Sequence, residues 1–202
     1  MLVRQTETDD PNPPALSTDA WIAQFSAPDP ALRRRAVRAL DSSAKSIDAL
    51  IAQLGEETAP SVRSAIFNAL SNAATPRAVE SLLLQLRSED AALRNGAIDA
   101  LQTLPQFVGP HVERLLADPD PDVRISAVSI LSALAHPDIP KWLADVVRRD
   151  ANVNVCAAAV DALAEAGDEA AVEAIAALPE RFPGVPYIAF AVAATVRRIK
   201  GL

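Results

Sequence analysis

The sequence has few of the cysteines and histidines on which disulfides and transition-metal sites depend, and its acidic residues outnumber its basic ones. It contains one cysteine, Cys156, so no disulfide can form within the chain. Two histidines and one cysteine supply few nitrogen and sulfur ligands, and we expect no metal and no cofactor. The formal net charge is −7, whereas binding to nucleic acid depends on Lys and Arg side chains that neutralise phosphates. The composition therefore predicts no nucleic-acid partner.

Signals for catalysis, secretion and membrane insertion are also missing from the sequence. It has no C-x-x-C, H-E-x-x-H or G-x-S-x-G motif and no glycine-rich phosphate loop, which favours a binding protein over an enzyme. The first residues contain no apolar h-region, so we expect no secretory signal. The longest apolar stretch, residues 187–196, is about half the length that a bilayer requires. These features predict a cytoplasmic protein that does not enter a membrane.

Small and aliphatic residues are abundant instead, and they recur in a fixed order. Hydrophobic residues make up 50% of the chain but aromatic residues only 4%, so Ala, Leu, Val and Ile must form most of the core. Five similar segments begin at Leu32, Val62, Leu93, Val123 and Val155. Their starts are 30, 31, 30 and 32 residues apart. A period in this range is typical of stacked units that cannot bury their apolar faces alone.

Each segment has the spacing of an amphipathic helix, with apolar residues at places one, five, six, eight and nine. A second apolar run precedes each segment, and prolines mark the joins, where helices begin or end. We therefore predict an all-α fold, a right-handed α-solenoid of about six antiparallel helix pairs over residues 15–202. Residues 1–14 are polar, contain three prolines and lack periodicity, which predicts a disordered tail.

The pattern D-x-x-[VL]-R-x-x-A-[VI]-x-[AI]-L occurs at residues 90–101 and 120–131. It resembles the short HEAT repeats first described in phycobilisome lyases, and the resemblance covers about residues 15–200. That family mostly supplies binding scaffolds, so the resemblance implies a scaffold or adaptor that binds a partner protein through the concave face of the solenoid. The alternative that it implies is a chromophore lyase subunit, or an accessory factor that loads a cofactor onto a target. A fold alone does not decide between them.

The resemblance also implies that the second helix of each pair lines the concave face. Places three, seven and ten of each segment lie together on the helix face opposite the core, because residues three and four apart are neighbours on a helix. In the middle repeats these places hold short amides and hydroxyls. The alternative is an ordinary solvated helix face. The predicted partner-binding residues are Arg34, Arg38, Asn68, Ser71, Asn95, Asp99, Gln102, Ser129, Ser132 and Asp161.

Place two holds an arginine in four segments, at Arg33, Arg63, Arg94 and Arg124. One interpretation is a basic rail for an anion. The interpretation that we favour is that each guanidinium pairs with a turn carboxylate, such as Asp29, Asp90 or Asp120, and ties neighbouring repeats together. Cys156 holds this place in the fifth segment, so we expect no such tie there.

The last apolar helix can be buried on either of two faces. One register buries Ile188, Val192, Val196 and Ile199, and the register of the repeat alignment buries Tyr187, Phe190, Ala191 and Ala194. The face that is left open is a candidate for docking or self-association, and we assign this role to Tyr187, Phe190, Ala191 and Ala194. A homodimer through this helix is the corresponding hypothesis. The alternative is that the neighbouring helices cover both faces.

Overall fold

The computed structural model describes residues 16–167 and 169–201, and all regular elements in these residues are helical. The predicted tail, residues 1–14, lies outside the described residues. The helices are α1 Thr18–Ala23, η1 (3₁₀) Gln24–Ser26, α2 Pro30–Ala39, α3 Ala44–Glu56, α4 Pro60–Ala73, α5 Pro76–Gln85, α6 Ala91–Gln102, α7 Pro105–Val108, η2 (3₁₀) Gly109–His111, α8 Val112–Leu116, α9 Pro121–Ala133, α10 Ile139–Arg149, α11 Val153–Ala166, α12 Glu169–Ala176, α13 Leu178–Arg181 and α14 Pro186–Ile199.

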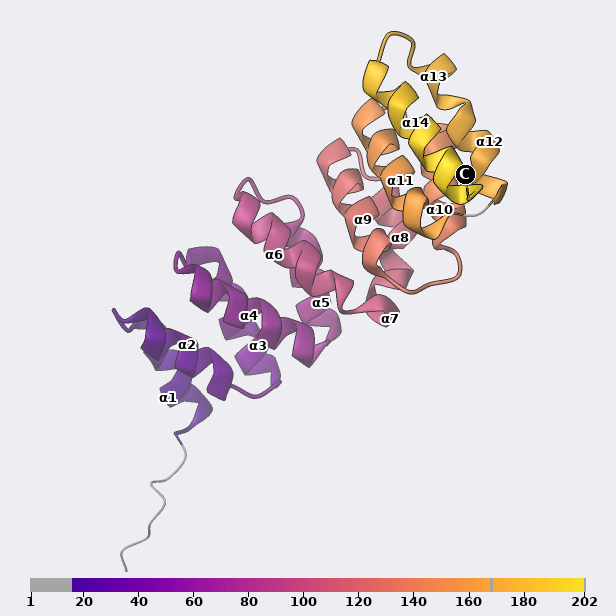
Figure 1. Ribbon diagram of the computed structural model, residues 1–202. Helices are drawn as coiled ribbons and strands as arrows, with labels where there is room; N and C mark the ends of the chain where they lie inside the picture. The colour runs from indigo at the N-terminus through magenta and orange to yellow at the C-terminus, as the bar shows by residue number, and fades with distance from the viewer. Residues whose placement is uncertain (1–15, 168, 202) are drawn as a thin grey trace, which may run out of the picture.

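These helices form six pairs that stack side by side (Figure 1). The second helices of the pairs, α2, α4, α6, α9, α11 and α14, make one row, and each contacts the next. The first helices pack behind them. Aliphatic side chains between the two rows form one continuous core. The architecture confirms the predicted all-α solenoid of six helix pairs. No helix in the described part of the chain has the length and apolarity to cross a bilayer.

Turn residues set where the second helices begin. The carboxylates of Asp29, Asp90 and Asp120 accept hydrogen bonds from backbone N–H groups at the starts of α2, α6 and α9. Prolines open α2, α4, α5 and α9, at a position where the backbone N–H has no helical acceptor. The first helix of the fourth pair is broken into α7, η2 and α8 around Pro110, which has no N–H to donate.

Three of the four arginines at place two tie the turns of neighbouring repeats, as predicted, but with different carboxylates from most of those expected. Each guanidinium donates to the backbone carbonyl six residues earlier, Arg33 to Ala27, Arg63 to Glu57, Arg94 to Ser88 and Arg124 to Asp118. Across the repeat boundary, Arg33 pairs with Glu57, Arg63 with Asp90, and Arg124 with Asp150. The pairing with Asp29 and Asp120 was wrong, because each paired arginine reaches a carboxylate in the turn of the following repeat and not in its own turn. Arg94 has no carboxylate partner among the described residues.

The turn of the fifth repeat is held by a different set of bonds. The thiol of Cys156 lies 3.4 Å from the carbonyl oxygen of Asp150, again six residues earlier. The guanidinium of Arg181, from α13, donates to the same oxygen at 2.6 Å and also to the carbonyl of Val147. Among the described residues, place two of this repeat forms no guanidinium–carboxylate pair, and an arginine of the next repeat bonds to backbone carbonyls of the turn instead. Arg181 stands outside the repeated place, so the alignment of segments did not reveal it.

Glu57 is the least exposed carboxylate among these ion pairs, with 1% of its side chain exposed. It accepts two hydrogen bonds from the guanidinium of Arg33, both at 2.8 Å. The backbone N–H groups of Thr58 and Ala59 donate to it as well. The hydrogen bonds from Arg33 outweigh the effect of burial and lower the pKa of Glu57 from 4.5 to about 2.

We expect acid to destabilise the fold through Glu57. Because its pKa is lowered in the folded state, its contribution is complete above the ordinary pKa of 4.5 and is lost as the pH falls to about 2. The loss amounts to at most about 3 kcal/mol of unfolding free energy. Urea unfolding between pH 6 and pH 2 measures it, and Glu57→Gln should make the pH dependence shallower. An equal dependence in both proteins would contradict this assignment.

The last helix, α14, adopts the first of the two registers. Ile188, Val192 and Thr195 are buried, whereas Tyr187 and Phe190 are 46% and 77% exposed. Ala194 is exposed and Ala191 is half-buried. The register of the repeat alignment is therefore wrong by one residue. Of the four residues assigned to docking, Tyr187, Phe190 and Ala194 are therefore exposed to solvent. The hydroxyl of Tyr187 donates to the Asn154 side chain at 3.0 Å.

Candidate functional site

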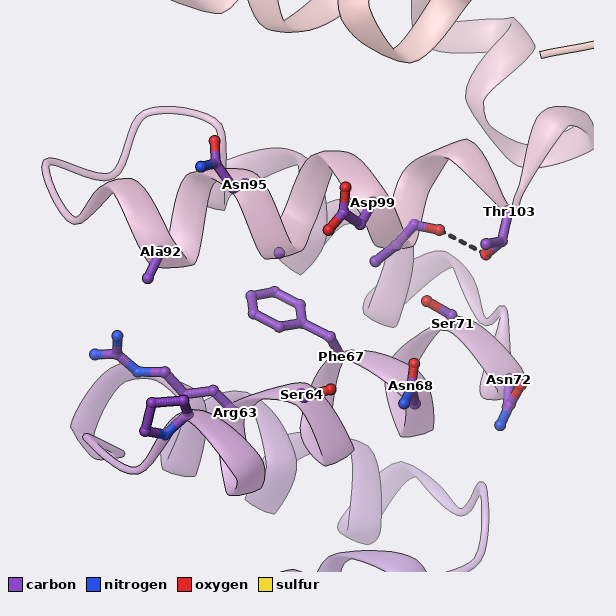
Figure 2. A pocket seen from close by; sticks show the side chains of 13 residues that line it. Arg63, Ser64, Phe67, Asn68, Ser71, Asn72, Ala92, Asn95, Asp99 and Thr103 are labelled. Atoms are coloured by element: carbon purple, nitrogen blue, oxygen red, sulfur yellow. Dashed lines mark hydrogen bonds between the residues drawn. The ribbon is translucent and has the colours of Figure 1, made fainter. Parts of the chain in front are cut away.

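A groove of about 630 Å³ lies between α4 and α6 on the face formed by the second helices (Figure 2). Its volume falls within the range of about 300–1,000 Å³ that is usual for ligand sites. Four of the ten predicted partner-binding residues line it, Asn68 and Ser71 on α4 and Asn95 and Asp99 on α6. These four residues come from two segments 31 residues apart, and the stacking of the second and third pairs brings them together.

The bottom of the groove is closed by a large residue packed against a small one. The ring of Phe67, on α4, lies between the two helices and is 6% exposed (Figure 2). It fits there because residue 96 of α6 is a glycine. A Cβ at Gly96 would lie 2.3 Å from Cε2 of Phe67, well inside van der Waals contact. The groove is therefore a furrow between two helices that touch at its floor.

Arg63 pairs with Asp90 and the hydroxyl of Thr103 donates to the carbonyl of Ala100, but the other polar side chains on the groove walls have no partners within the described residues. This is true of Ser64, Asn68, Ser71, Asn72, Asn95 and Asp99, none of which forms a side-chain hydrogen bond or ion pair there. An asparagine amide can donate two hydrogen bonds and accept two, and a serine hydroxyl can do both as well. The walls thus present donors, acceptors and one negative charge, at Asp99, to whatever enters the groove.

A smaller hollow of about 290 Å³ continues the groove toward α2. Asn68 and Asn72 line both hollows, so the two adjoin at the C-terminal half of α4. Arg38 lines the smaller hollow. Arg34, one turn earlier on α2, forms no ion pair with the described residues. The predicted cationic residues therefore lie beside the groove on the same row of helices.

The remaining predicted residues do not join this site. The amide of Gln102 donates to the backbone carbonyl of Ser129 at 2.8 Å, and so links α6 to α9. The hydroxyls of Ser129 and Ser132 donate to carbonyls of their own helix. Asp161 is exposed on α11 and lines neither hollow. The side chains of Gln102, Ser129 and Ser132, which were predicted to bind a partner, therefore form hydrogen bonds within the protein itself.

Three residues of the site were not singled out from the sequence. Phe67 and Gly96 form the floor of the groove, and Asn72 joins its two parts. A signal for the first two exists in the repeat alignment. Place six holds Val or Ile in the other four segments, and only the third segment has glycine at place four. Asn72 lies at place eleven, outside the columns considered.

The described residues give no support for metal or thiol chemistry. Within residues 16–167 and 169–201, no group of three or more His, Cys, Asp or Glu side chains could hold a metal ion. Burial raises the pKa of the Cys156 thiol, which keeps it protonated. The ring of His136 stacks on Trp142 with 4.7 Å between ring centroids.

Comparison with known families accounts for the repeat. A family model of HEAT repeats matches residues 18–102 and 110–182. The chain belongs to the HEAT-repeat family. The two matched blocks of this HEAT-repeat chain are separated by residues 103–109, where the first helix of the fourth pair is broken. No curated protein matches the sequence.

Solved structures similar to this HEAT-repeat chain are of low identity. The archaeal HEAT-like repeats protein from Thermococcus onnurineus NA1 is 18% identical over 91% of this chain and 87% of that chain, with a TM-score of 0.49. An engineered protein is 18% identical over 91% of this chain and 96% of its own, with a TM-score of 0.43. A designed armadillo repeat protein is 17% identical over 91% and 100%, with a TM-score of 0.40.

Proposed function

We propose that this HEAT-repeat chain is an interaction scaffold or adaptor that binds a partner protein through its second-helix face. The observation that supports this most is the gathering of polar side chains without partners in the described residues along one groove, between α4 and α6. A protein interface needs hydrogen-bonding groups as well as apolar area, and the groove offers both over its Phe67 floor. A cytoplasmic location belongs to the same proposal.

The chromophore-lyase alternative finds less support in the groove. A bilin site would need aromatic and acidic side chains that reach the ligand. Among the described residues that line the groove, Asp99 is the one carboxylate and Phe67 the one aromatic residue, and Phe67 is buried. We therefore propose binding without an enzymatic activity. Self-association through Tyr187, Phe190, Ala191 and Ala194 remains a separate prediction.

Blocking the groove should abolish capture of the partner. In the triple variant Asn68→Arg, Asn95→Arg and Asp99→Arg, three long cationic side chains fill the groove and reverse its charge. We expect a protein that wild type captures from native lysate to be depleted at least about 10-fold with this variant, as loss of central interface contacts predicts. Quantitative mass spectrometry of the captured proteins measures the depletion.

The matched control changes the charge by the same +4 on the opposite row of helices. It combines Leu84→Arg, Gln106→Arg and Glu173→Arg, three exposed residues of α5, α7 and α12. Circular dichroism should show both triple variants folded, because all the altered side chains are exposed or line an open groove. Retention of the same partner by the groove variant, or its loss with the control, would refute the assignment of the binding face.

A further inference from the structure

The groove also indicates what kind of segment enters it. Resting on the proposed function, we propose that the partner presents an extended segment that crosses from α6 over α4 to α2. A Lys or Arg side chain of the segment pairs with Asp99, and an Asp or Glu side chain about five residues away pairs with Arg38. The path follows the two hollows, which adjoin at α4 where Asn68 and Asn72 line both of them.

The shape of the groove favours an extended chain over a helix. α4 and α6 touch through Phe67 and Gly96, so the space above them is a furrow between adjacent helices. An α-helix with its side chains is about 10–12 Å across, whereas packed helices lie only about 8–10 Å apart. A helix on the proposed path would rest on the ridge of α4 and on the rims of both hollows without entering either. An extended chain is narrow enough to bring its peptide groups to the amide of Asn68, which can donate and accept at once.

The charges at the two ends of this path are opposite, and each lacks a partner in the described residues. Asp99 lies on the α6 wall and Arg38 at the α2 end. Asp41 also lines the α2 end, but its carboxylate already accepts hydrogen bonds from Ser43 and Ser46. A ligand therefore meets a free negative charge at one end and a free positive charge at the other.

The separation of the two charges sets the spacing in the partner. From α6 to α2 is two helix-to-helix steps, about 16–20 Å in all. An extended chain rises about 3.3 Å per residue, so about five or six residues cover this span. The segment thus carries a basic and an acidic residue with four or five residues between them, and their order along the chain fixes the direction in which the segment binds.

A selection from random ten-residue peptides displayed on phage tests this proposal on the full chain. We expect the retained peptides to pair a basic with an acidic residue at this spacing, with one order of the two predominating. The double variant Arg38→Glu and Asp99→Lys should retain peptides with the opposite order. Peptides without the charged pair, or an order that stays the same with the double variant, would overturn the proposal.

One retained peptide, synthesised with a fluorescent label, gives the quantitative measurement. Asp99→Lys should weaken its binding at least about 10-fold, because it replaces an attractive charge with a repulsive one. Asp161→Lys makes the same change at place seven of α11, outside both hollows, and should alter binding less than about 2-fold. If no peptide is retained above the level of the groove-blocked triple variant, the extended segment is refuted. The scaffold function survives that outcome if the same triple variant still loses its captured partner.

Discussion

Replacing Arg33 with methionine is expected to lower the free energy of unfolding by about 3 kcal/mol, because it leaves the buried carboxylate of Glu57 without its counter-charge. Glu57 is 1% exposed, so water cannot replace the two hydrogen bonds from the guanidinium. The variant also loses the bonds from Arg33 to the carbonyls of Ala27 and Pro28. Urea unfolding at pH 7 measures the change.

Arg94→Met is the matched control, since Arg94 holds the same place in its repeat. Its guanidinium donates to the carbonyl of Ser88 but pairs with no carboxylate of the described residues, so we expect a loss of about 1 kcal/mol. Adding Glu57→Gln to Arg33→Met should restore part of the stability, because the buried charge is then gone. A similar loss for Arg33→Met and Arg94→Met would show that the buried ion pair adds nothing beyond an ordinary hydrogen bond.

The sequence predicted the stacking of helix pairs because most of the repeats bury the same places, although Leu32, at place one of the first segment, is exposed. Val62, Leu93, Val123 and Val155, all at place one, are buried as the spacing requires. The prediction failed where one repeat departs from the others. In α14 the buried register is shifted by one residue, so that Ile188, Val192 and Thr195 face the core. In the turn before α11, Arg181 of α13 takes the role that an arginine at place two has in the other repeats. Because Arg181 lies outside the aligned segments, their comparison could not detect it.

The sequence predicted which residues of the groove share a helix face, but not which of the predicted residues bond within the protein. Helical spacing correctly placed Asn68, Ser71, Asn95 and Asp99 on one face, and the packing of α4 against α6 makes that face a groove. Spacing does not say which bond a polar side chain will form. The hydroxyl of Ser129 donates to the carbonyl of Ile125 on its own helix, as serine within helices often does. Phe67 and Gly96 differ from the residues at the same places of the other segments, and these two residues form the floor of the groove.

Gly96→Ala is expected to destabilise the protein, by about 1–3 kcal/mol, although the same change within a helix ordinarily stabilises it by about 1 kcal/mol. The new methyl group would lie 2.3 Å from the Phe67 ring, which is itself buried. Either the ring turns out into the groove or α4 and α6 separate. Both outcomes cost packing energy, and both alter the floor of the proposed binding site.

The sign of the effect should reverse when Phe67 is valine. Phe67→Val restores the residue type found at place six in Val37, Val128 and Val160, and it removes the atoms that an alanine at residue 96 would meet. In that background, Gly96→Ala should stabilise the protein by up to about 1 kcal/mol through helix propensity. A double-mutant cycle measured by urea unfolding gives the coupling between the two positions, which we expect to reach about 2 kcal/mol or more. Additive effects would mean that the helices separate freely, and that the Phe67 ring does not hold the floor of the groove closed.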